Sequence, residues 1–178
     1  LKENGLSCVP VPNPKKFTGI MNEYFTGRGI KQHQLPNVQQ FLLTMGVGED
    51  SKPMFTPADP KQDDRELIEA DDDNDPPFDV HRYQVGCGEA IWLLRARHDA
   101  ARTIQRLCSR MSKPRVSDWE KLKRLARYLA TNPSRGLCFH APIDANATLM
   151  TYLYADASLY LRSVSGVAAF LGTPDFVN

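Results

Sequence analysis

Residues 119–129 read WEKLKRLARYL and residues 149–156 read LMTYLYAD. In the first stretch, apolar residues return at helical spacing from Trp119 to Leu129, and basic residues lie away from that face. The second stretch is a β-favouring apolar run that ends on Asp156. A carboxylate in that place is either an ordinary turn residue or the ligand of a cation. The two patterns predict an α+β fold and make Asp156 a candidate metal ligand.

The composition is that of an ordinary globular protein. The chain has 178 residues, of which 42% are hydrophobic and 24% charged, with a net charge of +1. It has no apolar run long enough to cross a bilayer and no signal-peptide pattern. We therefore expect no membrane partner and an intracellular location, not secretion, with the compartment unknown. Because the chain begins at Leu1, we expect a fragment of a longer protein.

The cysteines lie at wide, irregular spacings, at positions 8, 87, 108 and 138. Disulfide frameworks and zinc sites favour short repeated spacings, so we expect reduced and mostly buried thiols. Cys138 and His140 share one strand face, but they lack the second ligand pair of a metal site.

The small net charge conceals a strong asymmetry between two segments. Residues 59–79 carry ten acidic and two basic side chains, whereas residues 95–127 carry eleven basic and three acidic ones. We predict an acidic, mobile linker over residues 59–81 and a surface that faces a polyanion over residues 95–127. In an alternative interpretation, the acidic segment folds back on the basic surface and competes with that polyanion.

The residues before the linker show less regularity. Val9–Pro14 and Lys52–Pro57 are rich in proline and are expected to be extended or irregular. Between them, Pro36–Met45 has the apolar spacing of a short helix, with Pro36 in its first turn and Gly46 to end it.

Two basic amphipathic helices are predicted beyond the linker. The first spans Glu89–Met111, and the second starts with the capping-box pattern Ser117–Glu120 and runs to Leu129. A short link at Pro114 favours an antiparallel helix pair with packed apolar faces. The candidate nucleic-acid-binding residues on the opposite faces are Arg95, Arg102, Arg106, Arg110, Lys121, Lys123, Arg124 and Arg127.

The excess of one charge sign on these helices has two interpretations. It is either a plain solvated surface or a surface that contacts phosphates, for which arginine is well suited. Few carboxylates lie three or four residues away to pair the cations, which favours phosphate contact. Such contacts position a nucleic-acid backbone and do not read its bases.

The pattern changes to that of strands after residue 131. Asn132–Gly136 reads as a turn, and strands are predicted at Leu137–His140, Thr148–Asp156 and Val164–Leu171. We expect these three strands to form one antiparallel sheet with open edges.

Several short motifs follow one another along the chain. Lys123–Leu129 reads Lys-Arg-Leu-Ala-Arg-Tyr-Leu, and Arg162–Gly166 reads Arg-Ser-Val-Ser-Gly. Further motifs lie at Gln34–Val47, Lys52–Pro57, Tyr83–Trp92, Ala96–Asp99, Met111–Pro114, Asp118-Trp119, Gly136-Leu137 and Tyr154–Tyr160. In this order and spacing, the chain resembles the end of the reverse transcriptase region of a copia-type retrotransposon Pol polyprotein, running into the start of its ribonuclease H domain.

The resemblance implies a division into four parts. Residues 1–58 would end the reverse transcriptase region, and residues 59–81 would be the acidic linker. Residues 82–131 would form the basic helical connection, and residues 132–178 the first antiparallel strands of a truncated ribonuclease H-like sheet.

The resemblance also implies a role for Asp156 as the first metal-binding, catalytic aspartate of ribonuclease H. That chemistry uses several carboxylates to hold two Mg²⁺ ions, and the partner acids of the family would lie beyond this chain. Ser158 and Leu159 depart from the family's Asp and Trp, and His98 departs from its Pro, as in a diverged copy.

We therefore expect a polyprotein fragment that is not catalytically competent alone. Its partners would be an RNA–DNA hybrid or other nucleic acid and the remaining parts of the polyprotein. The alternatives are a non-enzymatic nucleic-acid-binding module that uses the basic helix faces, and a structural remnant without activity.

Overall fold

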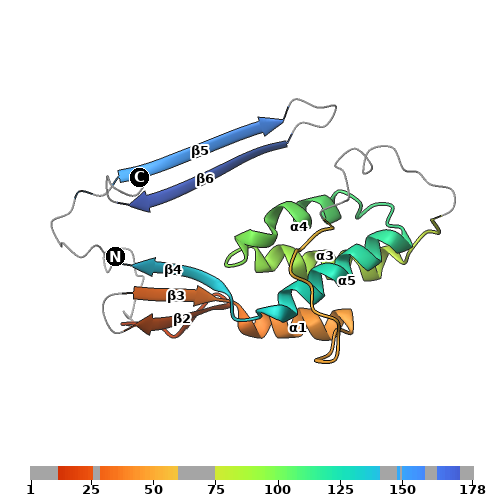
Figure 1. The fold of residues 1–178 in the computed structure, drawn as a ribbon, viewed down its shortest axis with the longest axis horizontal. Helices are drawn as coiled ribbons and strands as arrows, with labels where there is room; N and C mark the ends of the chain where they lie inside the picture. The colour runs from red at the N-terminus through yellow and green to blue at the C-terminus, as the bar shows by residue number, and fades with distance from the viewer. Residues whose placement is uncertain are drawn as a thin grey trace, which may run out of the picture. The chain divides into compact units, whose positions relative to one another are not determined.

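The computed structural model describes residues 12–25, 29–59, 75–140, 148, 150–158 and 164–172. The chain divides into two compact units, Leu1–Phe139 and His140–Asn178, and its elements are a mixture of helices and strands, as predicted (Figure 1). The interior of the predicted acidic linker, residues 60–74, lies outside the described residues. No helix in the described ranges is both long and apolar enough to cross a membrane.

The first unit contains a sheet of four strands in the order β1-β2-β3-β4. Thr18 and Gly19 both have positive φ angles, 46° and 83°, and they join the first two strands in a tight turn of the type that matches strand twist. No strand was predicted between residues 16 and 33, where the structure has three. The strands are β1 (Lys16–Phe17), β2 (Ile20–Phe25), β3 (Gly29–His33) and β4 (Gly136–His140).

Strand β4 has the predicted position in the sequence but not the predicted partner. It lies beside β3, antiparallel to it, and not in a sheet with the later strands (Figure 1). The edge of β3 offers unpaired backbone groups to the chain as it leaves the last helix. Gly136 permits this approach, because a Cβ atom there would collide with the Gln32 carbonyl.

The second unit contains a long antiparallel hairpin. Strands β5 (Met150–Ser158) and β6 (Val164–Gly172) confirm the two predicted strands, and Asp156 pairs with Gly166 across the hairpin. The expected sheet of three strands is wrong in its first member, because β4 belongs to the other sheet.

The helices pack together in the first unit. Helix α1 (Leu35–Met45) confirms the prediction, and Gly46 ends it in the left-handed conformation with φ of 66°. The predicted helix Glu89–Met111 is wrong as a single element. It is replaced by α3 (Val80–Leu93), the 3₁₀ turn η2 (His98–Ala100) and α4 (Ala101–Cys108), followed by α5 (Val116–Thr131).

One apolar core joins these helices. The Tyr83 hydroxyl of α3 donates to the Leu107 carbonyl of α4 at 2.9 Å inside it, so α3 and α4 are tied across the break between them. The fully or nearly fully buried members of the core are Val38, Phe41, Met45, Tyr83, Cys87, Ala90, Leu93, Ala100, Ile104, Leu107, Trp119, Leu122, Leu125, Ala126 and Leu129.

The break between α3 and α4 is held by a buried arginine. Arg97 is 1% exposed, and its Nε and Nη2 donate to the two Asp99 carboxylate oxygens at 3.0 and 2.9 Å. Its Nη1 donates to the Asn132 carbonyl at 3.0 Å, and the Tyr128 hydroxyl donates to Asp99 at 2.6 Å. These bonds fasten the break to the C-terminal end of α5.

Helix α5 begins two residues earlier than the predicted capping box. The carboxylate of Asp118 accepts a hydrogen bond from the backbone N–H of Arg115 at 3.1 Å, and Arg115 is the N-cap residue. The prediction chose Ser117 and Glu120 for these positions and is wrong in register, although the helix itself is confirmed. Similarly, the predicted linker extends too far, because the Asp79 side chain caps α3 through the Arg82 N–H.

Two glycines of α3 give a matched test of core packing. A Cβ atom on Gly86 would lie 2.8 Å from Leu122, whereas one on Gly88 would meet nothing within 4 Å. We expect Gly88→Ala to raise the free energy of unfolding by about 0.5–1 kcal/mol, because alanine favours a helix. Gly86→Ala should lower it by about 1–3 kcal/mol relative to Gly88→Ala, through overpacking. Urea denaturation of both variants measures the difference, and equal stabilities would contradict the close contact.

The carboxylate of Asp99 gives a pH-dependent test of the buried network. Burial acts to raise the pKa of Asp99, but hydrogen bonds from Arg97 and Tyr128 outweigh it and hold that pKa below its ordinary 3.8. A lowered pKa in the folded state means stabilisation that is complete above pH 3.8 and is lost as pH falls through the lowered value.

We therefore expect the free energy of unfolding to fall with acidification in the natural chain and to fall less in Asp99→Asn. Asp50→Asn, which removes an exposed carboxylate elsewhere, is the control. Urea titrations at neutral pH and at about pH 3 provide the measurement. The same acid-induced loss in Asp99→Asn would contradict the role of this carboxylate.

Candidate functional site

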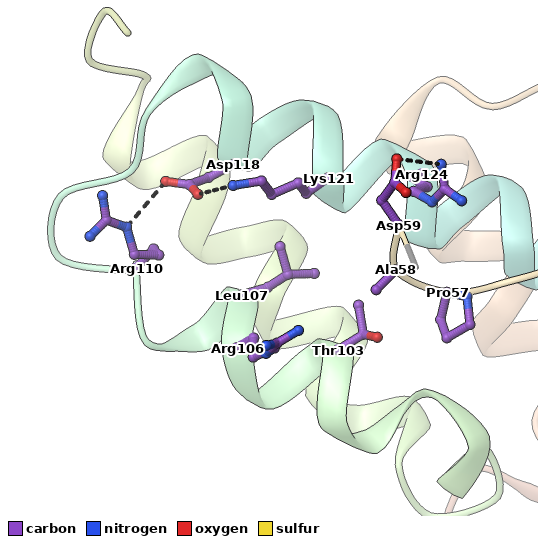
Figure 2. A pocket seen from close by; sticks show the side chains of 10 residues that line it. All are labelled: Pro57, Ala58, Asp59, Thr103, Arg106, Leu107, Arg110, Asp118, Lys121 and Arg124. Carbon is purple, nitrogen blue, oxygen red and sulfur yellow. Dashed lines mark hydrogen bonds and ion pairs between the residues drawn. The ribbon is translucent and has the colours of Figure 1, made fainter. Parts of the chain in front are cut away.

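A small pocket lies between α4, α5 and the segment at residues 57–59 (Figure 2). It encloses about 40 Å³ and is lined at its apolar part by Pro57, Ala58, Thr103 and Leu107. Its charged lining residues are Asp59, Arg106, Arg110, Asp118, Lys121 and Arg124.

The sequence builds this pocket through helical spacing. The lining residues of α4 lie at positions 103, 106 and 107, with Arg110 in the turn that follows, and those of α5 lie at positions 118, 121 and 124. Steps of three and four place side chains on one face of a helix. Residue 110 faces residue 118, and the early part of α4 faces Arg124 (Figure 2), so the predicted antiparallel helix pair is confirmed for α4 and α5.

Asp118 neutralises one end of the pocket. Its carboxylate lies 3.5 Å from Arg110 Nε and 3.5 Å from Lys121 Nζ, and its side chain is 3% exposed. Together with its bond to the Arg115 N–H, these contacts make Asp118 a structural residue. A buried carboxylate with several partners is costly to remove.

Asp59 approaches the other end from a different segment. Its Oδ2 lies 3.9 Å from Arg124 Nη1, and Arg124 Nη2 donates to Thr56 Oγ1 at 3.0 Å. The Asp59 side chain is 48% exposed, in contrast to Asp118. This pair is long and partly solvated, and such pairs contribute little to stability.

The pocket is cationic overall. Four basic and two acidic side chains line it, which leaves an excess of positive charge for an anion. The buried Nε of Arg124 has no hydrogen-bond partner among the described residues. A donor of this kind in a cationic recess favours a bound oxyanion.

Half of the predicted nucleic-acid-binding residues meet in this pocket, and half do not. Arg95 does not share a helix face with the predicted arginines of α4, because the chain breaks after α3 and separates it from them. Its Nη1 donates to the Thr18 carbonyl at 2.8 Å, and its guanidinium lies over Trp92 at 4.8 Å. Lys123 pairs with Glu120 at 3.1 Å outside the pocket. Arg102 on α4 and Arg127 on α5 do not line it.

The few carboxylates among these cations are all paired. Each acidic residue between positions 95 and 127 has a basic partner: Asp99 pairs with Arg97, Asp118 with Arg110, and Glu120 with Lys123.

Both described ends of the predicted acidic linker contact α5 or its N-cap. Beyond the Asp59–Arg124 pair, Arg115 Nη1 donates to the Asp75 carbonyl at 3.0 Å. The Asp75 carboxylate accepts from the Ser117 N–H at 3.2 Å. At these two ends, the acidic segment lies against the basic helix pair.

Asp156 lies on β5 of the second unit, and its side chain is outside the described part of the structure. Among the described residues, no group of three or more His, Cys, Asp or Glu side chains could hold a metal ion. A two-magnesium site needs several carboxylates, so the described side chains do not fit one. Cys87 is a buried free thiol, as expected, but the free thiol of Cys138 is exposed.

Two residues of the site escaped the sequence interpretation. The sequence pattern assigns Asp59 to the linker, although the proline-rich segment before it contacts α5. Asp118 appears there only in the motif Asp118-Trp119 and inside the predicted capping box, without a role of its own. Asp118 had a detectable signal, because a carboxylate three residues after the N-cap is typical of a helix start. Nothing local marks the contact between Asp59 and Arg124.

The chain resembles one protein of known sequence at low identity. It is 29% identical over 157 residues to an uncharacterized mitochondrial protein of Arabidopsis thaliana, and the match covers 84% of this chain and 62% of the relative. No protein-family model matches the chain, and no solved structure matches it. The chain thus spans less than two thirds of its relative. This distant similarity supports a retrotransposon-derived origin.

Proposed function

We propose that this chain is a fragment of a copia-like retrotransposon polyprotein, from the end of its reverse transcriptase region to the start of its ribonuclease H domain, and that its basic helices bind a nucleic-acid phosphate backbone. The observation that carries the proposal is the meeting of Arg106, Arg110, Lys121 and Arg124 in one pocket between two antiparallel helices. The order of the sequence motifs and the distant relative support the polyprotein origin.

The chemistry of these side chains suits a nucleic-acid backbone. Arginine presents planar N–H donors that match phosphate oxygens, and its charge persists at any physiological pH. The pocket is lined by side chains from two helices and holds no aromatic ring on which a base would stack. Contacts of this kind position a duplex by its phosphates, with little dependence on sequence.

The binding of a labelled RNA–DNA hybrid should depend steeply on salt. The slope of log binding constant against log salt is about −0.9 for each phosphate contacted, so one phosphate held in the pocket contributes about −1 and every further phosphate contact along α4 and α5 makes it steeper. Arg106→Gln should make the slope less steep by about one. Fluorescence anisotropy over a range of salt concentrations measures both slopes.

A matched control is Lys31→Gln, which removes a lysine that pairs with Glu23 on the N-terminal sheet at 3.4 Å. Its slope should equal that of the natural chain. Absence of hybrid binding at low salt would refute the proposal, as would an identical loss in both variants.

The parent family suggests a further role for Asp156, as a magnesium ligand in a site completed by carboxylates from outside this chain. Within this chain the residue sits on β5, opposite Gly166 of β6. One carboxylate does not hold two magnesium ions, so the role requires more of the polyprotein.

The 178-residue chain alone should therefore show no magnesium-dependent cleavage of a labelled RNA–DNA hybrid. Gel analysis of the labelled RNA strand, with and without Mg²⁺, measures this. Cleavage that requires Mg²⁺ and disappears in Asp156→Asn would contradict the expectation and assign a complete site to the chain. Cleavage that survives Asp156→Asn would remove the proposed role of this residue.

A further inference from the structure

We propose that the pocket between α4 and α5 binds a single phosphate group in exchange for the carboxylate of Asp59, which holds the anion position in the unbound chain. The inference rests on the proposed function in one respect, namely that the natural source of the phosphate is a nucleic-acid backbone. The pocket itself binds phosphate whatever its source.

The two carboxylates of the pocket differ in a way that identifies the replaceable one. Asp118 is 3% exposed, contacts Arg110 and Lys121, and accepts the N–H of the N-cap residue of α5. Asp59 is 48% exposed, and its Oδ2 lies 3.9 Å from Arg124 Nη1. Loss of Asp118 would leave two partly buried cations without their carboxylate and the start of α5 uncapped, whereas the pair between Asp59 and Arg124 is long and partly solvated.

The cations lie where an entering anion would meet them. Arg106 and Arg124 come from facing helices, and Arg124 is paired with Asp59 (Figure 2). Arg124 also donates to the hydroxyl oxygen of Thr56 in the same segment. A phosphate oxygen that takes the place of the Asp59 carboxylate can accept from Nη1 of Arg124, and a phosphate has further acceptor oxygens for Arg106 in the same pocket.

The size of the pocket agrees with a single phosphate group. The recess has a volume of about 40 Å³, so it is small but has room for a group larger than one water molecule. It can therefore serve as a subsite for one backbone phosphate.

Inorganic phosphate is the probe for the isolated site. We expect phosphate titration of the full chain at low ionic strength to shift the side-chain N–H resonances of Arg124 in NMR spectra. Asp59→Asn should tighten phosphate binding by about two- to fivefold, the fold-change that corresponds to a partly exposed ion pair. Asp59→Glu, which keeps the competing charge, should restore the weaker affinity.

Glu120→Gln is the matched control for Asp59→Asn. It removes one negative charge from α5, where Glu120 pairs with Lys123 at 3.1 Å outside the pocket. Lys123→Gln is the corresponding control for Arg124→Gln, which should abolish the phosphate response. Urea denaturation of each variant confirms that the fold is retained. Equal effects of Asp59→Asn and Glu120→Gln, or an unchanged response in Arg124→Gln, would overturn the inference.

The hybrid duplex then separates this inference from the proposed function. Phosphate binding that depends on Asp59, without any hybrid binding, supports the pocket and refutes the nucleic-acid role. Hybrid binding that neither inorganic phosphate nor Asp59→Asn changes refutes the pocket and leaves the nucleic-acid role in place. Tighter hybrid binding by Asp59→Asn alone supports both.

Discussion

Burial of the Arg97 guanidinium is the constraint on which the arrangement of the helices depends. A cation that is 1% exposed is stable only when its N–H groups and its charge are matched. Asp99 takes two of its donors, the Asn132 carbonyl takes another, and the Tyr128 ring lies 5.6 Å from the guanidinium. All three partners are available only if the chain breaks between α3 and α4 and the break lies against the end of α5. The network therefore selects two helices where the apolar spacing alone allows one.

The break determines which basic residues act together. A continuous helix would align Arg95 with Arg102, Arg106 and Arg110 in one stripe. With the break, Arg95 binds the β1–β2 turn and supports the sheet, while Arg106 on α4 and Arg110 just after it line the pocket beside α5. The pocket is thus a consequence of the Arg97 network, because the network fixes the position of α4 against α5. A buried ion pair contributes specificity of arrangement here, whatever its net contribution to stability.

The sequence predicted the elements with strong periodicity and missed the ones that long-range contacts create. Helices α1 and α5 and strands β5 and β6 follow from apolar spacing and from Gly46, and the antiparallel α4–α5 pair follows from the short link at Pro114. The break at Arg97 could not be predicted in this way, because the residues that hold it, Asn132 and Tyr128, lie some thirty residues further along the chain. The partner of β4 was missed for the same reason, because an edge strand more than a hundred residues away accepts it. For the site, the sequence identifies the candidate basic residues, but it does not show which of them line the pocket between α4 and α5.

The acidic residues near the pocket have two physically distinct roles. Asp118 is buried and tied to a helix start, so its charge belongs to the fold and offsets two cations permanently. Asp59 is half exposed and comes from a segment that Thr56 and Arg124 hold at the pocket, so its charge offsets a cation reversibly. A chain with eleven basic residues between positions 95 and 127 would repel itself without such acids. If all the acids were buried like Asp118, they would permanently offset the positive charge that a polyanion needs. Because Asp59 is partly exposed, the positive charge of Arg124 stays accessible to a polyanion.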